Sequence, residues 1–561
     1  AALAKEGRGR PERYVVAMAL FFGNRFEECV PLFEGLLESR PHGELHNNLL
    51  FCYLRLGAYA SAKSLLEALP EDWMSNQEAR HLGIEFAQQV GDLVLLKQLS
   101  IAQLRDRPDL AMSWVFRLMT AGRESQEELL SVVAGIPELV DGSTREITQI
   151  ATCEMSHGSE HQGLRRIYRM RRSRMTDVDV AAAHLSAHLL VRKPLPHLEM
   201  ELAVVAPGSY FTAVDSEGRT HTRAIDPEGL IDLPDAEEYR PASHKDVVPF
   251  MGSRVGSEVE IPQAFDAPKK LRVIAIGSSF RRLLESSQEL LKASITSSSI
   301  ISVISLPEDE EGQLDFSQMK AQVLKGAEAG REVMEAYRNA PLTIGGVCRL
   351  VGRSVLDAVC SWPSTESKLD VGGGPEEERA KALQLFVRPD AAYVIDAATL
   401  IELGRLDSLP LLSSLPKLYC TTKTHQLLRA ELEEASRERS LGTAVAHQGE
   451  LAVVPTTDEQ WAARLDFLRR LVEAVEAYCE IRPSYGPHDW RRMPSQLREV
   501  VSDEEAATLL LGVELGATLF CLDARLRLLG RTLELSGVWP QPFLAFCMGQ
   551  GHLSKLAYSL A

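Results

Sequence analysis

The sequence predicts a chain of several domains: an N-terminal all-α helical repeat array, a small β-rich middle domain and a C-terminal α/β domain with a parallel sheet. Glycines recur every 34 residues near the start, short apolar runs between turns fill the middle, and buried-strand patterns alternate with helices near the end. The length of 561 residues also exceeds the about 100–200 residues of one domain. We place the parts at residues 1–192, 195–278, 279–388 (an α/β connecting region) and 389–561.

Composition and charge exclude several classes of protein. Hydrophobic residues make up 45% and charged residues 25%, which is typical of a globular protein and not of a disordered or fibrous one. A net charge of -17 excludes a surface that coats nucleic acid without specificity, so any such contact has to be local. The nine cysteines form no C-x-x-C pair, which indicates free thiols in a reducing compartment. With no run of about 18 apolar residues, we expect a soluble cytoplasmic protein with no membrane contact.

The helical array is predicted from Gly23, Gly57 and Gly91, which are 34 residues apart. The first two follow apolar helical runs, and a second amphipathic helix begins after each of the three, so each glycine is expected to end one helix of a pair. Gly122 and Gly158 continue the pattern to about residue 190. The period, the apolar pattern and an aromatic residue soon after the first two turns resemble tetratricopeptide repeats. This resemblance implies a protein or peptide partner on a concave surface, and the alternative is a purely structural role.

The last helices of the array carry a basic run. Its members are Arg165, Arg166, Arg169, Arg171, Arg172 and Arg174. They are interpreted either as a contact for phosphate or an acidic protein, or as a solvated helix face.

The middle of the chain changes to short strand patterns. Strands are predicted at 202–205, 210–214, 255–261 and 271–276. In residues 247–261, a pair of large residues, a basic residue and Val-Gly precede an acidic, alternating strand. This stretch resembles the C-terminal domain of Gre-type transcript-cleavage factors. This resemblance implies docking on RNA polymerase without the coiled coil that stimulates cleavage. The alternative is a generic β-barrel linker module.

The connecting region shows a strand pattern at 300–306 and a helix pattern at 319–337. Apolar periodicity lapses at 370–377, which predicts an exposed turn. No Lys-Ser/Thr follows Gly372-Gly373-Gly374, so the sequence does not support a phosphate-binding loop there.

The C-terminal domain carries acidic residues where strands end. Asp396 directly follows a short buried-strand pattern at 393–395 and precedes a helix at 397–406. Because ligands bind outside the carboxyl ends of parallel strands, an acidic residue at this position indicates a site. Further units are a strand at 418–422 with a helix at 424–437, and a helix at 503–515 with a strand at 518–522 and Asp523.

Three stretches, 394–403, 503–517 and 519–527, resemble PIN domains, a family of metal-dependent ribonucleases. The resemblance implies Mg²⁺ or Mn²⁺ held by Asp396, Glu505 and Asp523, because these hard cations bind carboxylate oxygen. Leu427 stands where the family usually has a glutamate, and Glu431, one helical turn on, is the candidate replacement.

Two neighbours of Glu505 have a simpler interpretation. Asp503 and Glu504 are interpreted as residues that favour a helix N-terminus.

RNA contacts are predicted in two places. Arg525 and Arg527 follow Asp523 and are close enough to hold a phosphodiester. Arg482, Trp490 and Arg491 belong to a loop in which arginines alternate with aromatic residues, a mixture that stacks bases and holds phosphates. The alternative for this loop is a packed surface turn.

The order of the three resemblances is similar to that of proteins of bacterial conflict and antiphage systems. The leading hypothesis is therefore a metal-dependent endoribonuclease, held at RNA polymerase by the Gre-like part and sensing a protein partner through the array. The alternative is a non-catalytic adaptor with a degenerate PIN fold, which Leu427 motivates.

Overall fold

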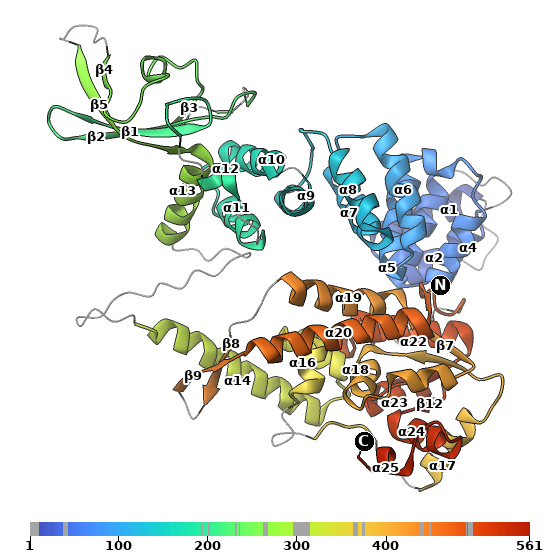
Figure 1. Cartoon of the computed structure of the whole chain (residues 1–561). Helices are drawn as coiled ribbons and strands as arrows, with labels where there is room; N and C mark the ends of the chain where they lie inside the picture. Colours follow the sequence, from blue (N-terminus) through green and yellow to red (C-terminus); the bar gives the residue numbers. More distant parts are fainter. Residues whose placement is uncertain are drawn as a thin grey trace. The chain divides into compact units, whose positions relative to one another are not determined.

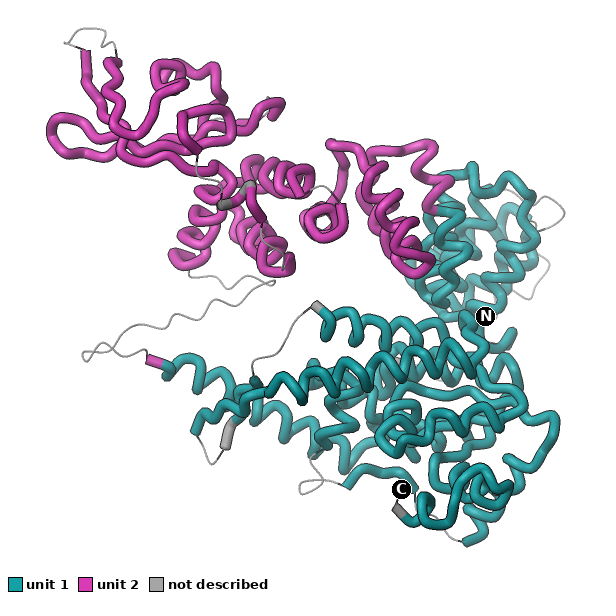
Figure 2. Tube along the Cα trace, in the orientation of Figure 1, with its two compact units in different colours: residues 1–99, 316–561 teal, residues 100–315 magenta. Residues whose placement is uncertain are grey.

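The fold is described from a computed structural model of the chain, which divides into two compact units (Figure 2). One unit combines residues 1–99 with 316–561, and the other is 100–315. The description covers residues 10–37, 43–158, 160–191, 195–199, 202–230, 233–234, 236–261, 268–294, 315–362, 368–372, 376–437, 442–447, 450–489, 491 and 497–560. Within these residues, no helix is both long and apolar enough to cross a membrane.

The predicted helical pairs are present. The first unit contains α1 (Arg10–Phe22), α2 (Phe26–Glu34), α3 (Glu44–Leu56), α4 (Tyr59–Glu67), α5 (Gln77–Val90) and the start of α6 (Leu93–Asp106). Gly57 and Gly91 end α3 and α5 in the left-handed conformation, with φ of 69° and 76°, which favours glycine. These two turns confirm the predicted role of the glycines.

The second unit continues the helical pattern. Its helices are α7 (Ala111–Glu124), α8 (Gln126–Ala134), α9 (Thr144–His157), α10 (Glu160–Ser173), α11 (Val178–Leu190) and α12 (Pro196–Glu199). The predicted turn at Gly122 is wrong, because α7 continues past it to Glu124, and Ser125 then caps α8 by accepting a hydrogen bond from the Glu128 amide. Side-chain capping therefore starts the second helix here without a glycine turn.

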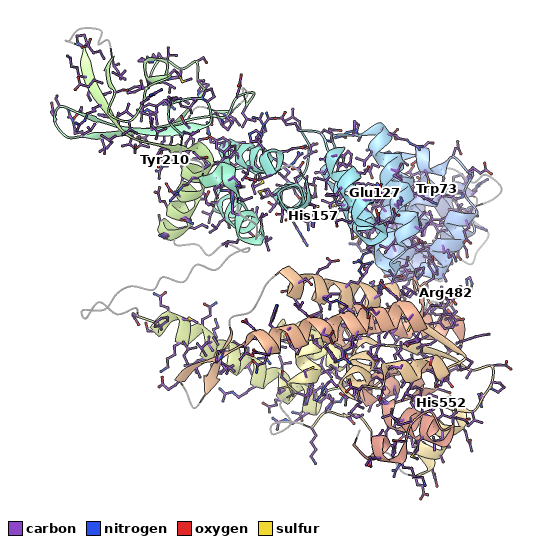
Figure 3. The ribbon with its side chains drawn as sticks, viewed as in Figure 1. Trp73, Glu127, His157, Tyr210, Arg482 and His552 are labelled. Atoms are coloured by element: carbon purple, nitrogen blue, oxygen red, sulfur yellow. The ribbon has the colours of Figure 1, made fainter. Side chains whose placement is uncertain are left out.

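A five-stranded mixed sheet follows in the same unit, in the order β3-β2-β1-β5-β4. The strands are β1 (Ser209–Asp215), β2 (Thr220–Ile225), β3 (Tyr239–Arg240), β4 (Glu258–Ile261) and β5 (Lys269–Ser278). Side chains alternate along β1: Phe211 packs with Phe250 in one core, and Tyr210, labelled in Figure 3, packs with α13 (Ser279–Ala293) and the last helices in another. The strand predicted at 202–205 is wrong, because these residues form bends and coil.

Buried ion pairs tie α10 to this sheet. Arg172 donates to the Asp226 carboxylate at 2.9 and 3.0 Å, and the Tyr168 hydroxyl donates to it at 2.7 Å. A second buried pair joins α10 to the neighbouring helix α9, where Arg166 bonds to Glu154 at 2.6 Å. Arg166 and Arg172, together with the buried Arg171, therefore belong to the interior and not to a solvated face.

The C-terminal sheet is fully parallel, in the order β10-β7-β6-β11-β12. Its strands are β6 (Ala392–Ile395), β7 (Lys417–Thr421), β10 (Glu480–Arg482), β11 (Thr518–Phe520) and β12 (Gly537–Val538). One face packs on α22 (Asp503–Leu515) and α23 (Ala524–Thr532), and the other on α17 (Glu376–Phe386), α18 (Ala397–Arg405), α20 (Asp458–Tyr478) and α24 (Pro540–Gly549) (Figure 1). This arrangement confirms the predicted parallel α/β domain.

The connecting region is shared between the units. Helix α13 packs in the core of the second unit, whereas α14 (Ser317–Asn339), α15 (Ile344–Val351) and α16 (Val355–Cys360) pack in the first. The helix predicted at 319–337 is confirmed as α14, and the strand predicted at 300–306 lies outside the described residues. The predicted domain boundaries stay predictions.

The helix predicted at 424–437 is present as α19 (Thr422–Arg437). The hairpin of β8 (Gly442–His447) and β9 (Glu450–Pro455) that follows it had no sequence prediction.

Replacing Asp226 with alanine tests the buried link between α10 and the sheet. The change leaves the Arg172 guanidinium buried without its partner, so we expect a loss of about 3–5 kcal/mol in the free energy of unfolding of the second unit. Urea denaturation followed by hydrogen exchange of peptides from 160–230 measures it. As a control, Glu217→Ala breaks a pair whose side chains are 66% and 63% exposed, and it is expected to change stability by no more than about 0.5 kcal/mol. Equal effects of the two changes would contradict this account.

Candidate active site

The candidate site lies where the order of the C-terminal strands reverses. Strand β6 is central, with Ile395 paired to Cys420 of β7 on one side and to Phe520 of β11 on the other. The chain runs from β6 to β7, whereas β11, much later in sequence, returns to the opposite side. In parallel α/β sheets, ligands bind outside the carboxyl ends of the strands at such a switch point, and Asp396 and Asp523 follow the two strands that flank it.

Asp396 is buried, with 1% exposure, and begins α18. One carboxylate oxygen accepts from the Thr399 amide at 3.0 Å, and the other accepts from the Cys521 thiol at 3.2 Å. The Thr399 hydroxyl in turn accepts from the Leu522 amide at 2.6 Å, which ties the start of α18 to the end of β11. These bonds fix the orientation of Asp396, as its position directly after the buried strand predicted.

Glu504 is the site residue that the sequence interpretation missed. Its Oε1 accepts from the Thr424 hydroxyl at 2.5 Å, from the Ala397 amide at 3.1 Å and from the Thr508 hydroxyl at 3.4 Å. A signal was present in the sequence, because Ser502-Asp503-Glu504-Glu505 is a capping-box pattern in which the last glutamate turns back to the helix start. The structure has this box, with Glu505 accepting from the Ser502 amide, so Glu504 is the residue directed to Asp396.

Glu505 and Asp523 contact a helix from the connecting region. Glu505 accepts from the Gly345 amide at 2.9 Å and from the Thr343 hydroxyl at 2.6 Å, and Asp523 accepts from the Ile344 amide at 2.6 Å. These three residues form the N-terminus of α15. The two carboxylates therefore bond to the positive end of a helix that the sequence did not place near the site.

Burial raises the pKa of all four carboxylates, and repulsion from a neighbouring carboxylate adds to it for Glu504, Glu505 and Asp523. Desolvation is the main cause in each case, and it raises the pKa of Glu504 to about 7, that of Glu505 to about 8 and that of Asp523 to about 6. The charge of Asp396 adds to the shifts of Glu504 and Asp523, and the charge of Asp523 adds to that of Glu505. The pKa of Asp396 is raised as well. A cluster of this kind gains stability from any positive charge placed among its members.

The donor set suits a hard divalent cation in chemistry, because it consists of carboxylate oxygens, the ligands that Mg²⁺ and Mn²⁺ prefer. The arrangement is closed, however: across the part of the chain described, no three His, Cys, Asp or Glu side chains are placed to hold a metal ion together. Glu505 and Asp523 bond instead to α15, and Asp396 bonds to Thr399 and Cys521.

Glu431 is not part of this cluster, which corrects its predicted role. Its carboxylate lies 3.8 Å from Arg464 of α20, and it also bonds to Ser354, which caps α16. Thr424 is the residue of α19 that contacts Glu504, and at 1.5 Å per residue Glu431 lies about 10 Å farther along the helix. Leu427, at the position where a glutamate was expected, packs against the hydrophobic core.

The two arginines after Asp523 serve the fold and not an RNA surface. Arg527 is 4% exposed and donates to the carbonyls of Cys521, Leu522 and Val371. Arg525 donates to carbonyls of the segment that precedes α15, including that of Ala340 at 2.8 Å. Their predicted contact with the phosphodiester is therefore corrected, because both guanidinium groups are engaged inside the protein.

The arginine- and aromatic-containing loop is partly a packed contact. Tyr485 stacks on Phe86 of α5 at 6.0 Å between ring centroids, and its hydroxyl donates to Asp92 at 2.9 Å. The loop thus joins the first helical pairs to the C-terminal domain within one unit.

Of the predicted RNA contacts in this loop, Arg482, which is labelled in Figure 3, is paired with Glu480 and is 43% exposed. It lies on the edge strand β10, where it pairs with Thr421 of β7. Arg491 is exposed, and Trp490 lies outside the described residues.

The raised pKa of Glu505 predicts a dependence of stability on pH. The pKa is about 8 in the folded chain and about 4.3 in an unfolded one. Between these values the folded state holds a proton that the unfolded state has lost, so stability falls as pH rises. Relative to Glu505→Gln, which does not titrate, wild type is expected to lose on the order of 1–3 kcal/mol in free energy of unfolding between pH 5.5 and 8.

Urea denaturation in EDTA at both pH values measures this difference. Glu473→Gln, at an exposed position of α20, is the control and should follow wild type. A parallel pH response of wild type and Glu505→Gln would show that Glu505 does not carry the effect.

Comparison with known proteins agrees with this geometry. A family model described as "PIN domain associated with the TPR-GreAB-C-PIN system" matches residues 394–532, from the end of β6 to the end of α23. The match includes Asp396, Glu504, Glu505 and Asp523 and excludes α15 and everything before it. No curated protein and no solved structure matches the chain significantly. Residues 394–532 thus form a PIN-type domain of the kind associated with the TPR and Gre system.

Proposed function

We propose that the C-terminal domain is a metal-dependent endoribonuclease whose reaction takes place at the acidic cluster beside β6. The observation that carries this proposal is the set of four buried carboxylates with raised pKa values at the switch point of the parallel sheet. The PIN-type match supports it, since PIN domains are generally nucleases. Fold alone does not establish the activity, so the argument depends on the site.

Asp396 and Glu504 would hold Mg²⁺ or Mn²⁺, and Glu505 and Asp523 would join them once separated from α15. When bound, such an ion activates water and neutralises charge on the scissile phosphate. The residues around the site set the positions of the carboxylates. Thr424 and the Ala397 amide hold Glu504 through Oε1, and the Thr399 amide and the Cys521 thiol hold Asp396. Such supporting bonds fix the geometry that a metal site requires.

The other parts of the chain would select the target. In this proposal the helical array binds a protein or peptide partner, and the mixed sheet of the second unit docks on RNA polymerase, so that the nuclease cuts transcripts in a bacterial conflict or antiphage response. Arg482, half-exposed at the sheet edge, is the remaining candidate of the predicted arginines near the site for a phosphate contact. A cytoplasmic location belongs to the same proposal and is consistent with nine free cysteines.

A non-catalytic adaptor is the second candidate. Leu427 in the hydrophobic core and Glu431 beside Arg464 favour it, because the second acidic position of the family has no replacement at the cluster except Glu504. An adaptor would bind its partners through the array and the mixed sheet and would cut nothing.

RNA cleavage by the purified full chain distinguishes the two candidates. We expect cleavage of single-stranded and structured RNAs with saturating Mn²⁺ and none with EDTA. Asp396→Asn, Glu504→Gln and Asp523→Asn should each lower the rate by more than the about 10–100-fold that follows the loss of an outer-sphere partner.

Glu431→Gln is the control for the cleavage assay, because it removes a partly buried carboxylate outside the cluster, and it should retain the wild-type rate. Cleavage that survives Asp396→Asn and Asp523→Asn would refute the assigned site. Binding to RNA polymerase without cleavage would favour the adaptor.

A further inference from the structure

The N-terminus of α15 makes the closest contact with the acidic cluster. Thr343, Ile344 and Gly345, here called the α15 seal, place one hydroxyl and two amide donors on Glu505 and Asp523, with distances between 2.6 and 2.9 Å. Both carboxylates are almost fully buried, at 3% and 0% exposure. The donors therefore act in a dry environment, where they replace the water or cation that the charges would otherwise require.

Two glycines make this contact possible. A Cβ atom on Gly345 would lie 2.4 Å from Glu505 Oε2, and one on Gly346 would lie 2.3 Å from the Val500 carbonyl oxygen. These separations are shorter than van der Waals contact, so any larger residue forces α15 and the start of α22 apart. Glycine is unfavourable inside a helix by about 1 kcal/mol relative to alanine, and here it allows close approach of the backbone.

The seal is also held from its upstream side. Arg525 follows Asp523 in the chain and donates to the carbonyls of Ala340 and Leu342, at 2.8 and 3.2 Å. The Thr343 amide donates to the Val500 carbonyl at 3.1 Å, next to the capping box of Glu505. Contacts with the loops on both sides of the cluster therefore hold the seal in place.

We propose that the α15 seal and a divalent cation are alternative occupants of Glu505 and Asp523, so that this conformation is a closed state of the site. The inference rests on the proposed function only in taking a divalent cation as the ligand. A cation bound to these carboxylates would face the positive end of α15 and its N–H donors. Since the two positive groups repel each other in a buried site, cation binding requires the seal to leave.

Gly345→Ala tests the proposal by placing a methyl group in the contact between α15 and the start of α22. Alanine is a better helix former than glycine, so α15 stays helical, while the new methyl group displaces the Glu505 carboxylate. Thr343→Val is a second variant that removes the hydroxyl donor and keeps the size of the side chain. Ser354→Ala is the matched control, because it removes the cap of the next helix, α16, from the same segment without touching Glu505 or Asp523.

The primary measurement is Mn²⁺ binding to the full chain by calorimetry or electron paramagnetic resonance. Gly345→Ala and Thr343→Val are expected to bind at least about tenfold more tightly than wild type, the equivalent of one lost competing hydrogen bond. Ser354→Ala should bind like wild type, and adding Asp523→Asn to Gly345→Ala should abolish the gain. Equal affinity of wild type and both seal variants, or no binding by any of them, would overturn the proposal.

A second readout uses wild type alone and does not depend on any variant folding. Saturating Mn²⁺ is expected to speed amide hydrogen exchange at Ile344 and Gly345, because their donors lose their acceptors. Unchanged or slower exchange at these two amides, with Mn²⁺ bound, would overturn the proposal. RNA cleavage is measured separately. Tighter Mn²⁺ binding by the seal variants without any RNA cleavage would refute the nuclease and support the α15 seal. RNA cleavage with unchanged Mn²⁺ affinity would support the nuclease and refute the seal.

Discussion

The burial of four carboxylates at one edge of a sheet is the constraint on which the rest of the C-terminal structure depends. Each charge is unfavourable in a dry site and raises the pKa of its neighbours. Hydrogen-bond donors offset this cost, because four helices begin at the cluster. Helices α15, α18, α22 and α23 direct backbone amides at these carboxylates. The positive ends of four helices thus perform part of the neutralisation that a metal ion performs in an open site.

This constraint explains why α15, from the connecting region, belongs with the C-terminal domain. The family match begins at Val394, yet α15 supplies three of the donors on Glu505 and Asp523, and Ala524 donates to the Asp370 carbonyl at 2.8 Å. A fragment that starts at β6 would lose these three donors and keep on the two carboxylates those from the Ser502 and Arg525 amides. The structural unit is therefore longer than the segment that the family comparison identifies.

Local patterns predicted the sheet and the two aspartates because both depend on short stretches: a buried strand followed at once by an acidic residue can be read without tertiary information. Glu504 was missed because the resemblance placed the metal ligand at Glu505, and the capping box that turns Glu505 back to the Ser502 amide was not used. The α15 contact joins residues about 160 positions apart in sequence, so no local periodicity reveals it. Arg525 and Arg527 were misassigned because the surrounding carbonyls, which come mostly from distant segments, decide where a guanidinium points.

Helix α22 connects two contacts that the sequence did not predict. One is the contact of α15 with the acidic cluster, and the other is the contact of the Tyr485 loop with α5. The first turn of α22 carries Glu504 and Glu505, and near the other end of this helix Glu514 accepts from the Tyr485 amide, in the loop that stacks on α5. The helix has 13 residues, about 20 Å, and acts as a rigid element between the repeat contact and the site. Rigid contact alone transmits nothing unless one end has two arrangements. The α15 seal, which bonds to Glu505 in the first turn of α22, is the element for which two arrangements are proposed.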